Sequence, residues 1–425
     1  MEMQKKAYAA GSRDESWGPD KDGMVVFSKL FPPHADHWYP LTGTLVLTDG
    51  SVLVTSSVTQ GETSHFSIAK LNPLGELDKR FAQEGLLTGL FVSNLPAYGG
   101  PLAQGADGRI YMLASSKSPD ALDPEIAILC IDETGKRNEH FGNNGQIIVA
   151  NKVNDRVFHG GPRFLRVLQN GDLLVGANGA VGPSRVPTAY LMKLDANGCL
   201  VASFGSSGIV DIKLPYPAMT LWKDACVLAD GRILGAGYAR LKSGFNVGLL
   251  VMLNSSGSFN QIFGDDPKTP GFRLFTDENR PVELNAVTER TPGKFLAAGT
   301  VGDAVRSDAI GLLSGFDAAG KNDPDFNGGV TLENTVSLND KSGWHALFAQ
   351  GENIYVAGGS AHLLLASFKL DGTLNPAFAK DGVVEDESLS VIPVSLTPYS
   401  SDRLLYGADS PGIGRIGSVI RYYRV

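Results

Sequence analysis

Cysteine is scarce in this chain. Its 425 residues include three cysteines, and these are widely separated, at Cys130, Cys199 and Cys226. A disulfide framework or a structural zinc site needs paired or clustered cysteines, so this number and spacing argue against both. They are typical of isolated thiols in a reducing compartment.

Basic residues are too few for a polyanionic partner. Lys and Arg number 37 against 45 Asp and Glu, a net charge of −8, which argues against nucleic acid and an anionic membrane surface. No apolar stretch approaches the roughly 18–20 residues that cross a bilayer, so we expect no membrane insertion. Residues 1–8 lack the apolar core of a secretory signal. We therefore expect a chain that stays in the cytoplasm or is exported without a cleaved signal.

Long helical patterns are absent, and glycine is abundant instead. No window longer than a turn or two shows a helical period, while 51 residues are glycine and 23 are proline. Such a composition suits many tight turns and opposes long helices. Charged residues make up 19% and hydrophobic residues 43% of the chain, so a large core is available and extensive disorder is not expected.

Many of the glycines belong to a repeat. One clear copy begins Leu–Asp–Ala–Asn–Gly at Leu194 and continues to Phe204–Gly205. Equivalent glycines recur 52 to 64 residues apart, at Gly11, Gly75, Gly135, Gly198, Gly257, Gly320 and Gly372. The aromatic residues that follow them are Trp17, Phe81, Phe141, Phe204, Phe263, Phe326 and Phe378. A period of this length indicates one supersecondary unit in many copies, each unable to bury its apolar face alone.

A second glycine turn lies between the copies of the first. Asp49–Gly50, Asp107–Gly108 and Asp230–Gly231 each separate two β-rich runs. Asp–Gly in this setting predicts a hairpin, because a type I′ turn needs positive φ at both central residues. Each repeat thus contains four antiparallel strands, and seven repeats predict an all-β, seven-bladed β-propeller of four-stranded blades. No linker interrupts the repeat, so we predict a single domain over residues 1–425.

The two ends of the chain complete one blade. The chain begins inside a repeat, at the Gly11 turn, and ends in Ser418–Val425, which has the character of a third strand. We therefore predict that the seventh blade takes this strand from the C-terminus and its outermost strand from Met24–Phe27, near the N-terminus. Sharing a blade in this way fastens the ring with main-chain hydrogen bonds.

The full pattern, Leu–Asp–x–x–Gly–x–Leu–Asp–x–x–Phe–Gly–x–x–Gly–x–Val, resembles that of the bacterial delta-60 repeat β-propellers. Matching runs include Asn143–Ile147, Ser206–Val210 and Lys380–Val384, and the resemblance covers essentially the whole chain. It implies a propeller of bacterial origin with no settled activity and no catalytic residues to transfer. The chain departs from the pattern at Trp17, where a Phe is expected, and at an insertion over Asp265–Gly271.

Motifs of catalysis and metal binding are missing. The chain has no Gly–x–Ser–x–Gly elbow, phosphate loop or His–Glu–x–x–His. His34 and His37 have a spacing compatible with a metal, but no pattern of further ligands lies nearby, so we interpret them as part of a solvated loop. The Asp-bearing loops 18–23 and 264–267 lack the spaced carboxylates of a calcium site and are interpreted as turns. We therefore predict no catalytic residue, no metal and no cofactor.

The two faces of the predicted ring differ. The turns within each hairpin are short and uniform and share one face, whereas the remaining loops and the crossovers between repeats vary and open on the other, where function is expected. These crossovers concentrate rings with polar tips, which suit stacking on sugars or anchoring a protein. The candidate ligand-binding residues are Trp38, Tyr39, Tyr98, Phe158, His159, Trp222, Trp344 and His345. The alternative is that these side chains pack between blades.

Two functions follow from this interpretation. The first is a non-catalytic binding or scaffold propeller that presents its aromatic-rich loop face to a glycan or a protein. The second is a hydrolase or lyase with a site in the central channel, for which the candidates are Arg163, Asp224, Glu283 and His345. We favour the binding propeller, because the candidate polar residues are too sparse around the predicted channel for a metal site.

Overall fold

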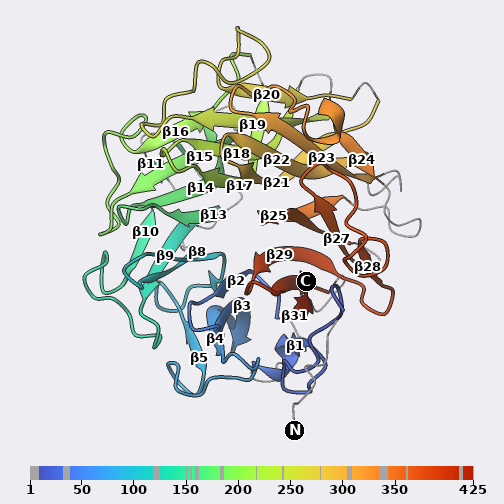
Figure 1. Ribbon diagram of the computed structural model, residues 1–425. Helices are drawn as coiled ribbons and strands as arrows, with labels where there is room; N and C mark the ends of the chain where they lie inside the picture. Colours follow the sequence, from blue (N-terminus) through green and yellow to red (C-terminus); the bar gives the residue numbers. More distant parts are fainter. Residues whose placement is uncertain are drawn as a thin grey trace.

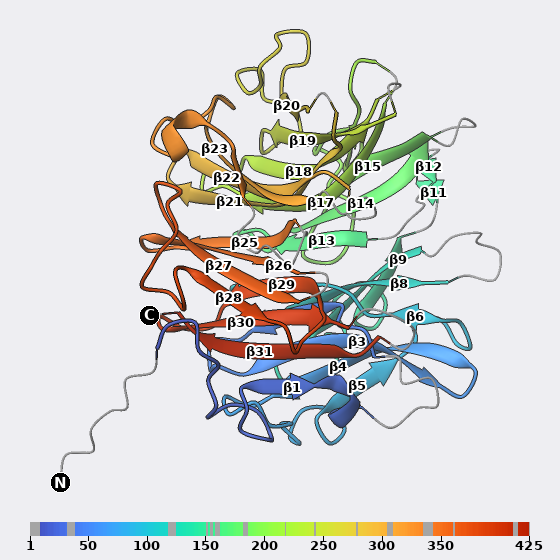
Figure 2. The ribbon, with the colours of Figure 1, turned by 90° about the vertical axis from the view of Figure 1, so that its right-hand side faces the viewer.

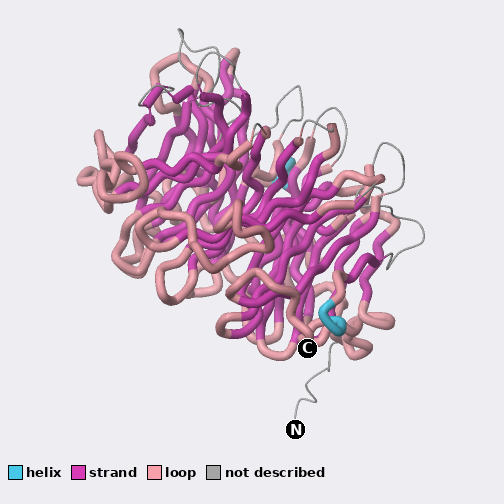
Figure 3. The backbone as a smooth tube through the Cα atoms, turned by 90° about the horizontal axis from the view of Figure 1, so that it is seen from above, coloured by secondary structure: helices cyan, strands magenta, loops and turns pink. Residues whose placement is uncertain are grey.

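Seven antiparallel sheets stand in a ring (Figure 1). The computed structural model describes residues 9–31, 39–117, 125–149, 152–153, 156–157, 162–181, 186–216, 218–241, 244–277, 279–303, 309–334, 343–359, 362–410 and 415–424. The predicted all-β, seven-bladed propeller is confirmed. The helices within these ranges are two short 3-10 turns, η1 (Phe27–Lys29) and η3 (Asn327–Gly329) (Figure 3). No helix in the described ranges has the length and apolar character needed to cross a membrane.

The blades are numbered here along the chain, with strands given from the channel outward. Blade 1 contains β2 (Gly43–Val46), β3 (Val52–Gln60), β4 (Thr63–Leu71) and β5 (Leu86–Gly89). Blade 2 contains a divided inner strand, β6 (Ala97–Tyr98) and β7 (Leu102–Gln104), then β8 (Ile110–Ser116), β9 (Glu125–Ile131) and β10 (Gln146–Val149). Blade 3 contains β13 (Pro162–Val167), β14 (Leu173–Val181), β15 (Val186–Leu194) and β16 (Ile209–Ile212), and the hairpin β11 (Lys152–Val153) and β12 (Arg156–Val157) also pairs with β14.

The remaining blades repeat the same order. Blade 4 contains β17 (Met219–Val227), β18 (Ile233–Arg240), β19 (Asn246–Leu253) and β20 (Phe272–Phe275). Blade 5 contains β21 (Val282–Thr291), β22 (Lys294–Val301), β23 (Ile310–Asp317) and β24 (Leu332–Asn334). Blade 6 contains β25 (Trp344–Gln350), β26 (Asn353–Gly358), β27 (Leu363–Lys369) and β28 (Val383–Asp386). Blade 7 contains β29 (Ile392–Pro398), β30 (Arg403–Asp409), β31 (Gly417–Tyr423) and β1 (Met24–Val26).

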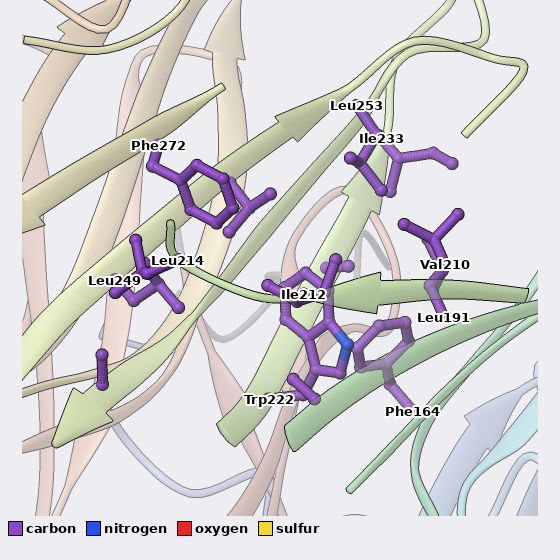
Figure 4. Close-up of a cluster of buried hydrophobic side chains, with 14 of the residues drawn as sticks. Phe164, Leu191, Val210, Ile212, Leu214, Trp222, Ile233, Leu249, Leu253 and Phe272 are labelled. Carbon is purple, nitrogen blue, oxygen red and sulfur yellow. The ribbon is translucent and has the colours of Figure 1, made fainter. Parts of the chain in front are cut away.

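Clusters of buried apolar side chains hold neighbouring blades together. In the described part of the chain there are seven such clusters, one at each contact between blades. Between blades 3 and 4, Phe164 meets Trp222 edge-on, with ring centroids 5.8 Å apart (Figure 4). Each blade supplies an apolar face to both neighbours, so no blade buries its core alone.

The residues of the repeat make the same contact at every junction, which we call the inter-blade clasp. The N–H of the residue after each repeat aromatic donates to the carbonyl of the residue before the repeat glycine of the next blade. These hydrogen bonds of 2.8–3.0 Å circle the ring, from Gly18 to Leu74, Ala82 to Thr134, Gly142 to Asn197, Gly205 to Ser256, Gly264 to Ala319, Asn327 to Asp371 and Ala379 to Ala10. The clasp therefore explains why the Gly and Phe positions recur together.

Glycine is required in the clasp for two reasons. Gly257 has φ of +86°, and a Cβ added to it would lie 3.1 Å from Cε2 of Phe204 in the preceding blade. The positive φ disfavours other residues, and the close approach of the ring leaves no room for their side chains. Phe204 itself is only 2% exposed. The aromatic residue of one copy is thus fitted to the glycine of the next.

The ring closes through the blade that the two termini share. β1 pairs antiparallel with β31, with Val25 opposite Val419, and the two strands lie side by side in Figure 2. This confirms the predicted sharing of one blade. The outermost strand ends one residue earlier than predicted, because Phe27 begins η1 and is buried beside the strand.

A buried carboxylate reinforces this closure. Asp14 is fully buried and accepts hydrogen bonds from Arg403 Nε at 2.6 Å, Arg421 Nε at 3.0 Å and the Tyr423 hydroxyl at 2.9 Å. Burial alone would raise the pKa of Asp14, but hydrogen bonds from Ser16 and Arg403 and the charge of Arg421 hold it well below its usual range. The N-terminal segment is therefore tied to β30 and β31 by charge as well as by strand pairing.

A second carboxylate near the closure is poorly compensated. Asp409, at the end of β30, is 3% exposed, and its Oδ1 has no hydrogen-bond partner among the described residues. The guanidinium of Arg415 lies 3.7 Å from its Oδ2. Burial raises the pKa of Asp409 to about 6, so the fold favours the protonated form.

We expect Asp409→Asn to raise the free energy of unfolding at pH 7.5 by about 1–3 kcal/mol. The folded-state pKa lies above the unfolded value, so the penalty is small near pH 4 and fully present above pH 6. Urea unfolding at both pH values checks this: variant and wild type should differ little at pH 4 and clearly at pH 7.5. Asp381→Asn, at an exposed carboxylate, is the control. A difference that is the same at both pH values would contradict the assignment.

Candidate functional site

The innermost strands of blades 3 to 7 share one irregularity. Each carries a β-bulge near its start, at which the pairing register skips one residue. The skipped residues are Arg163, Lys223, Asn285, His345 and Val394. A bulge re-aims a side chain, and bulges are frequent beside functional sites. Four consecutive blades therefore place a polar or cationic side chain at the same position of the ring.

Glycines on the second strands of blades 4 and 5 make room for these bulges. A Cβ on Gly237 would lie 1.9 Å from the carbonyl oxygen of Leu221, and one on Gly299 would lie 2.1 Å from that of Glu283. Both glycines follow an alanine near the end of their strand. This Ala–Gly pair is a sequence signal for the bulge, which an analysis based on turns overlooks.

A cavity of about 620 Å³ opens beside three of the bulges. Lys223, Asn285 and His345 line it, so blades 4, 5 and 6 each contribute a bulge residue. Residues 244–245 and 302–303, in the loops that follow the second strands of blades 4 and 5, and Asn246, which begins β19, also line it. The cavity therefore opens on the loop face, and its volume is within the range of small-molecule sites.

A chain of polar contacts runs along the cavity wall. Arg240 Nε donates to Asn246 Oδ1 at 2.8 Å, and Asn246 Nδ2 donates to Glu283 Oε1 at 2.6 Å. Lys223 Nζ lies 3.4 Å from Glu283 Oε2. Both carboxylate oxygens of Glu283 thus have partners, and the side chain is fixed in place.

The phenol of Tyr238 lies among the charges of this region. Lys223 Nζ is 5.5 Å from the centroid of its ring. Burial raises the pKa of Tyr238, the charge of Glu283 raises it further, and the charges of Arg240 and Arg163 oppose both effects. Three cations and one carboxylate therefore act on this single ring.

Several aromatic residues predicted to face a ligand are buried instead. Tyr39, Trp222 and Trp344 are each 1% exposed, so the prediction of an exposed aromatic face is wrong for them. Trp222 contacts Phe164 and donates Nε1–H to the carbonyl of Tyr190 at 2.8 Å. These rings fill the space between blades, as the alternative interpretation predicted.

The other predicted ligand-binding residues have different positions. Tyr98, in β6, is half-buried, whereas His345 is exposed and lines the cavity. Trp38, Phe158 and His159 lie outside the described residues.

Of the channel candidates, the structure brings Glu283 and His345 together at the cavity, while Arg163 and Asp224 do not line it. Asp224 accepts hydrogen bonds from Arg166 Nη2 at 2.5 Å and from the N–H of Val287 at 3.1 Å, so its carboxylate links blades 3, 4 and 5. Sequence reasoning missed Lys223, Arg240 and Asn246, which also line the cavity. Within the described ranges, no group of three or more His, Cys, Asp or Glu side chains could hold a metal ion.

A second cavity of about 620 Å³ lies on the turn face between blades 6 and 7. Its Arg424 donates to Gln350 Oε1 at 2.8 Å and to the carbonyl of Ser401 at 3.1 Å. Its Asn375 donates from Nδ2 to Asn353 Oδ1 at 3.2 Å. These groups hold strands and turns together, so we assign this cavity a structural role.

Comparison with known proteins shows the fold. No protein-family model matches the chain, and no curated protein matches it. Polysaccharide lyase Uly1 is 13% identical, with a TM-score of 0.52 over 92% of this chain and 90% of that chain. The β-propeller domain of the Trilobed protease from Pyrococcus furiosus is 8% identical, with a TM-score of 0.46 over 91% of this chain and 96% of that one. The α-L-arabinanase of Penicillium chrysogenum, complexed with arabinobiose, is 14% identical, with a TM-score of 0.45 over 76% and 92%. The first likeness shows a shared fold alone, and the other two are too distant to inform function.

Proposed function

We propose that this chain is a non-catalytic binding propeller that holds a glycan in the cavity on its loop face. The observation that carries the proposal is the set of hydrogen-bonding groups around that cavity, supplied by Lys223, Arg240, Asn246, Glu283 and Asn285. Sugar hydroxyls both donate and accept hydrogen bonds, so they pair with a wall that offers ammonium, guanidinium, amide and carboxylate groups.

The shape of the site favours a sugar over a protein surface. A volume of about 620 Å³ accommodates a small ligand, whereas a protein partner is usually anchored by exposed aromatic residues. The tryptophans that could have been such anchors, Trp222 and Trp344, are buried. Phe245, which is 38% exposed and lines the cavity, supplies an apolar ring against which a sugar face can pack.

Glu283→Gln is expected to weaken glycan binding by about ten- to a hundredfold, because the carboxylate of Glu283 fixes the side chains of Asn246 and Lys223 at the cavity wall. A glycan array identifies the ligand, and calorimetry on that ligand measures the change. Glu139→Gln, at an exposed carboxylate outside the cavity, is the matched control and should bind like the wild type. Unchanged binding by a folded Glu283→Gln protein would show that the ligand lies elsewhere. A blank array alongside capture of a protein would favour the protein partner.

A hydrolase or lyase acting in the same cavity is the second candidate. The observation in its favour is that Glu283 and His345, a carboxylate and an imidazole, line one cavity, and both groups can transfer protons. Incubation with the bound glycan, followed by measurement of new reducing ends, separates the two functions. Cleavage that Glu283→Gln abolishes supports the enzyme, and recovery of intact glycan supports the binding propeller.

We also propose that the chain is a member of the delta-60 repeat β-propellers. The support is the repeat itself, in which the Gly and Phe positions recur because they meet in the inter-blade clasp. A structure of a typical delta-60 chain tests this: the same clasp is expected at the same two positions, and a different contact there would count against membership.

A further inference from the structure

We infer that the ligand is acidic, a glycan whose terminal sugar carries a carboxylate that binds between Lys223 and Arg240. This inference rests on the proposed function and narrows it to one class of sugar. The inference is based on two observations: the carboxylates of the cavity already have partners, whereas its cations have N–H groups that can still donate hydrogen bonds.

The carboxylates of the cavity are engaged. Glu283 accepts from Asn246 at 2.6 Å through Oε1 and faces Lys223 at 3.4 Å through Oε2. Asp303, at the rim, also has an interaction partner. A neutral sugar would therefore find the carboxylate acceptors of the cavity largely occupied.

The cations, in contrast, keep unused donors. The ammonium of Lys223 has three N–H groups, and its contact with Glu283 is long, at 3.4 Å. Arg240 donates to Asn246 through Nε, and no described residue accepts a hydrogen bond from the two terminal amino groups of its guanidinium. A guanidinium binds a carboxylate through two parallel hydrogen bonds, and an ammonium adds a point charge. Together they fit a planar anion with two oxygens.

The local charge points the same way. Around Tyr238, the cavity residues Lys223 and Arg240 are joined by Arg163 from outside the cavity and face the carboxylate of Glu283, while Asp303 lies at the rim. The chain as a whole carries a net charge of −8, so this positive region is a local exception and not the consequence of a basic protein. A positive wall in a concave site concentrates anions and rejects cations.

The test uses an array of paired oligosaccharides, in which each member ending in a uronic acid has a partner with that carboxyl reduced to an alcohol. The acidic member of the pair that binds is expected to bind about ten- to a hundredfold more tightly than its reduced partner. Its affinity should fall as salt rises, whereas that of the reduced partner should change little.

Variants locate the carboxylate. Lys223→Gln is expected to remove most of the preference for the acidic member, because it weakens the binding of that member far more than the binding of the reduced one. Arg240→Gln should do the same and serves as a second variant if the first does not fold. Lys79→Gln, at an exposed lysine outside the cavity, is the control and should keep the full preference.

The outcomes separate the inference from the proposed function. Equal binding of both members of every pair, or a preference for the reduced members, would overturn the acidic ligand and leave a glycan-binding propeller. A preference that survives in both variants would overturn the assignment to Lys223 and Arg240. Binding to no glycan on the array would overturn the proposed function and the inference with it.

Discussion

Replacing Phe204 by alanine is expected to lower the free energy of unfolding by about 3–5 kcal/mol. The ring is 2% exposed and packs against Gly257 of the next blade, inside an inter-blade clasp. Its removal leaves a cavity between two sheets whose backbones are fixed by hydrogen bonds, so lost packing adds to lost burial. Denaturant unfolding followed by circular dichroism measures the loss.

Tyr216→Ala is the control for this experiment. Tyr216 is 39% exposed on the loop face, so its removal should change the free energy of unfolding by no more than about 0.5 kcal/mol. If Phe204→Ala lowers the free energy of unfolding by less than about 1 kcal/mol, the role assigned to the clasp is contradicted, because removing a ring that holds two blades together must destabilise the fold by more than that.

Asp14→Ala is expected to cost about 3–5 kcal/mol, since it leaves a buried cation without its counter-charge. The side chain of Arg421 is 6% exposed and pairs with Asp14 at 2.8 Å. Tyr423 also loses the acceptor of its hydroxyl. Because the folded-state pKa of Asp14 is depressed, this stabilisation is present above the unfolded pKa, near 4, and is lost only as the pH falls through the lower folded value. Unfolding at pH 7 therefore measures the full effect.

Asp402→Ala provides the comparison for the closure. Asp402 pairs with Arg403 at 2.5 Å, as Asp14 does at 2.6 Å, but its side chain is 43% exposed. An exposed pair contributes little, so we expect a loss below about 1 kcal/mol. If the two variants lose equal stability, burial of the charge is not what secures the closure.

The fold could be predicted because its signals are local and repeated. The Asp–Gly turns, and the spacing from Gly257 to Phe263 that recurs in every copy, lie within a few residues of each other. The pairing of the two termini could be predicted because each end of the chain contains part of one repeat. The inter-blade clasp could not be foreseen in the same way, since its two halves belong to different copies.

The site was harder to predict because it depends on a shift of one residue. Side chains alternate along a strand, so a bulge decides which of two neighbours faces the channel. The sequence drew attention to Trp222 and Asp224, but the bulge between them re-aims Lys223 toward the cavity. The same shift buries Trp344 and exposes His345. An aromatic residue near a strand start has the same sequence signature whether it packs between blades or faces a ligand.

The shared blade also sets the order of events while the chain is being made. β1 leaves the ribosome before its partner β31, which follows roughly 390 residues later, and at about 5–20 residues per second this is a wait of roughly 20–80 s. During that interval blades 1 to 6 can assemble side by side, but the outermost strand of blade 7 has nothing to pair with. A chain that is released before Gly417 has been synthesised forms an open arc of blades. The first and the last blade of that arc each leave an apolar face exposed. The ring therefore closes only after β31 has been synthesised.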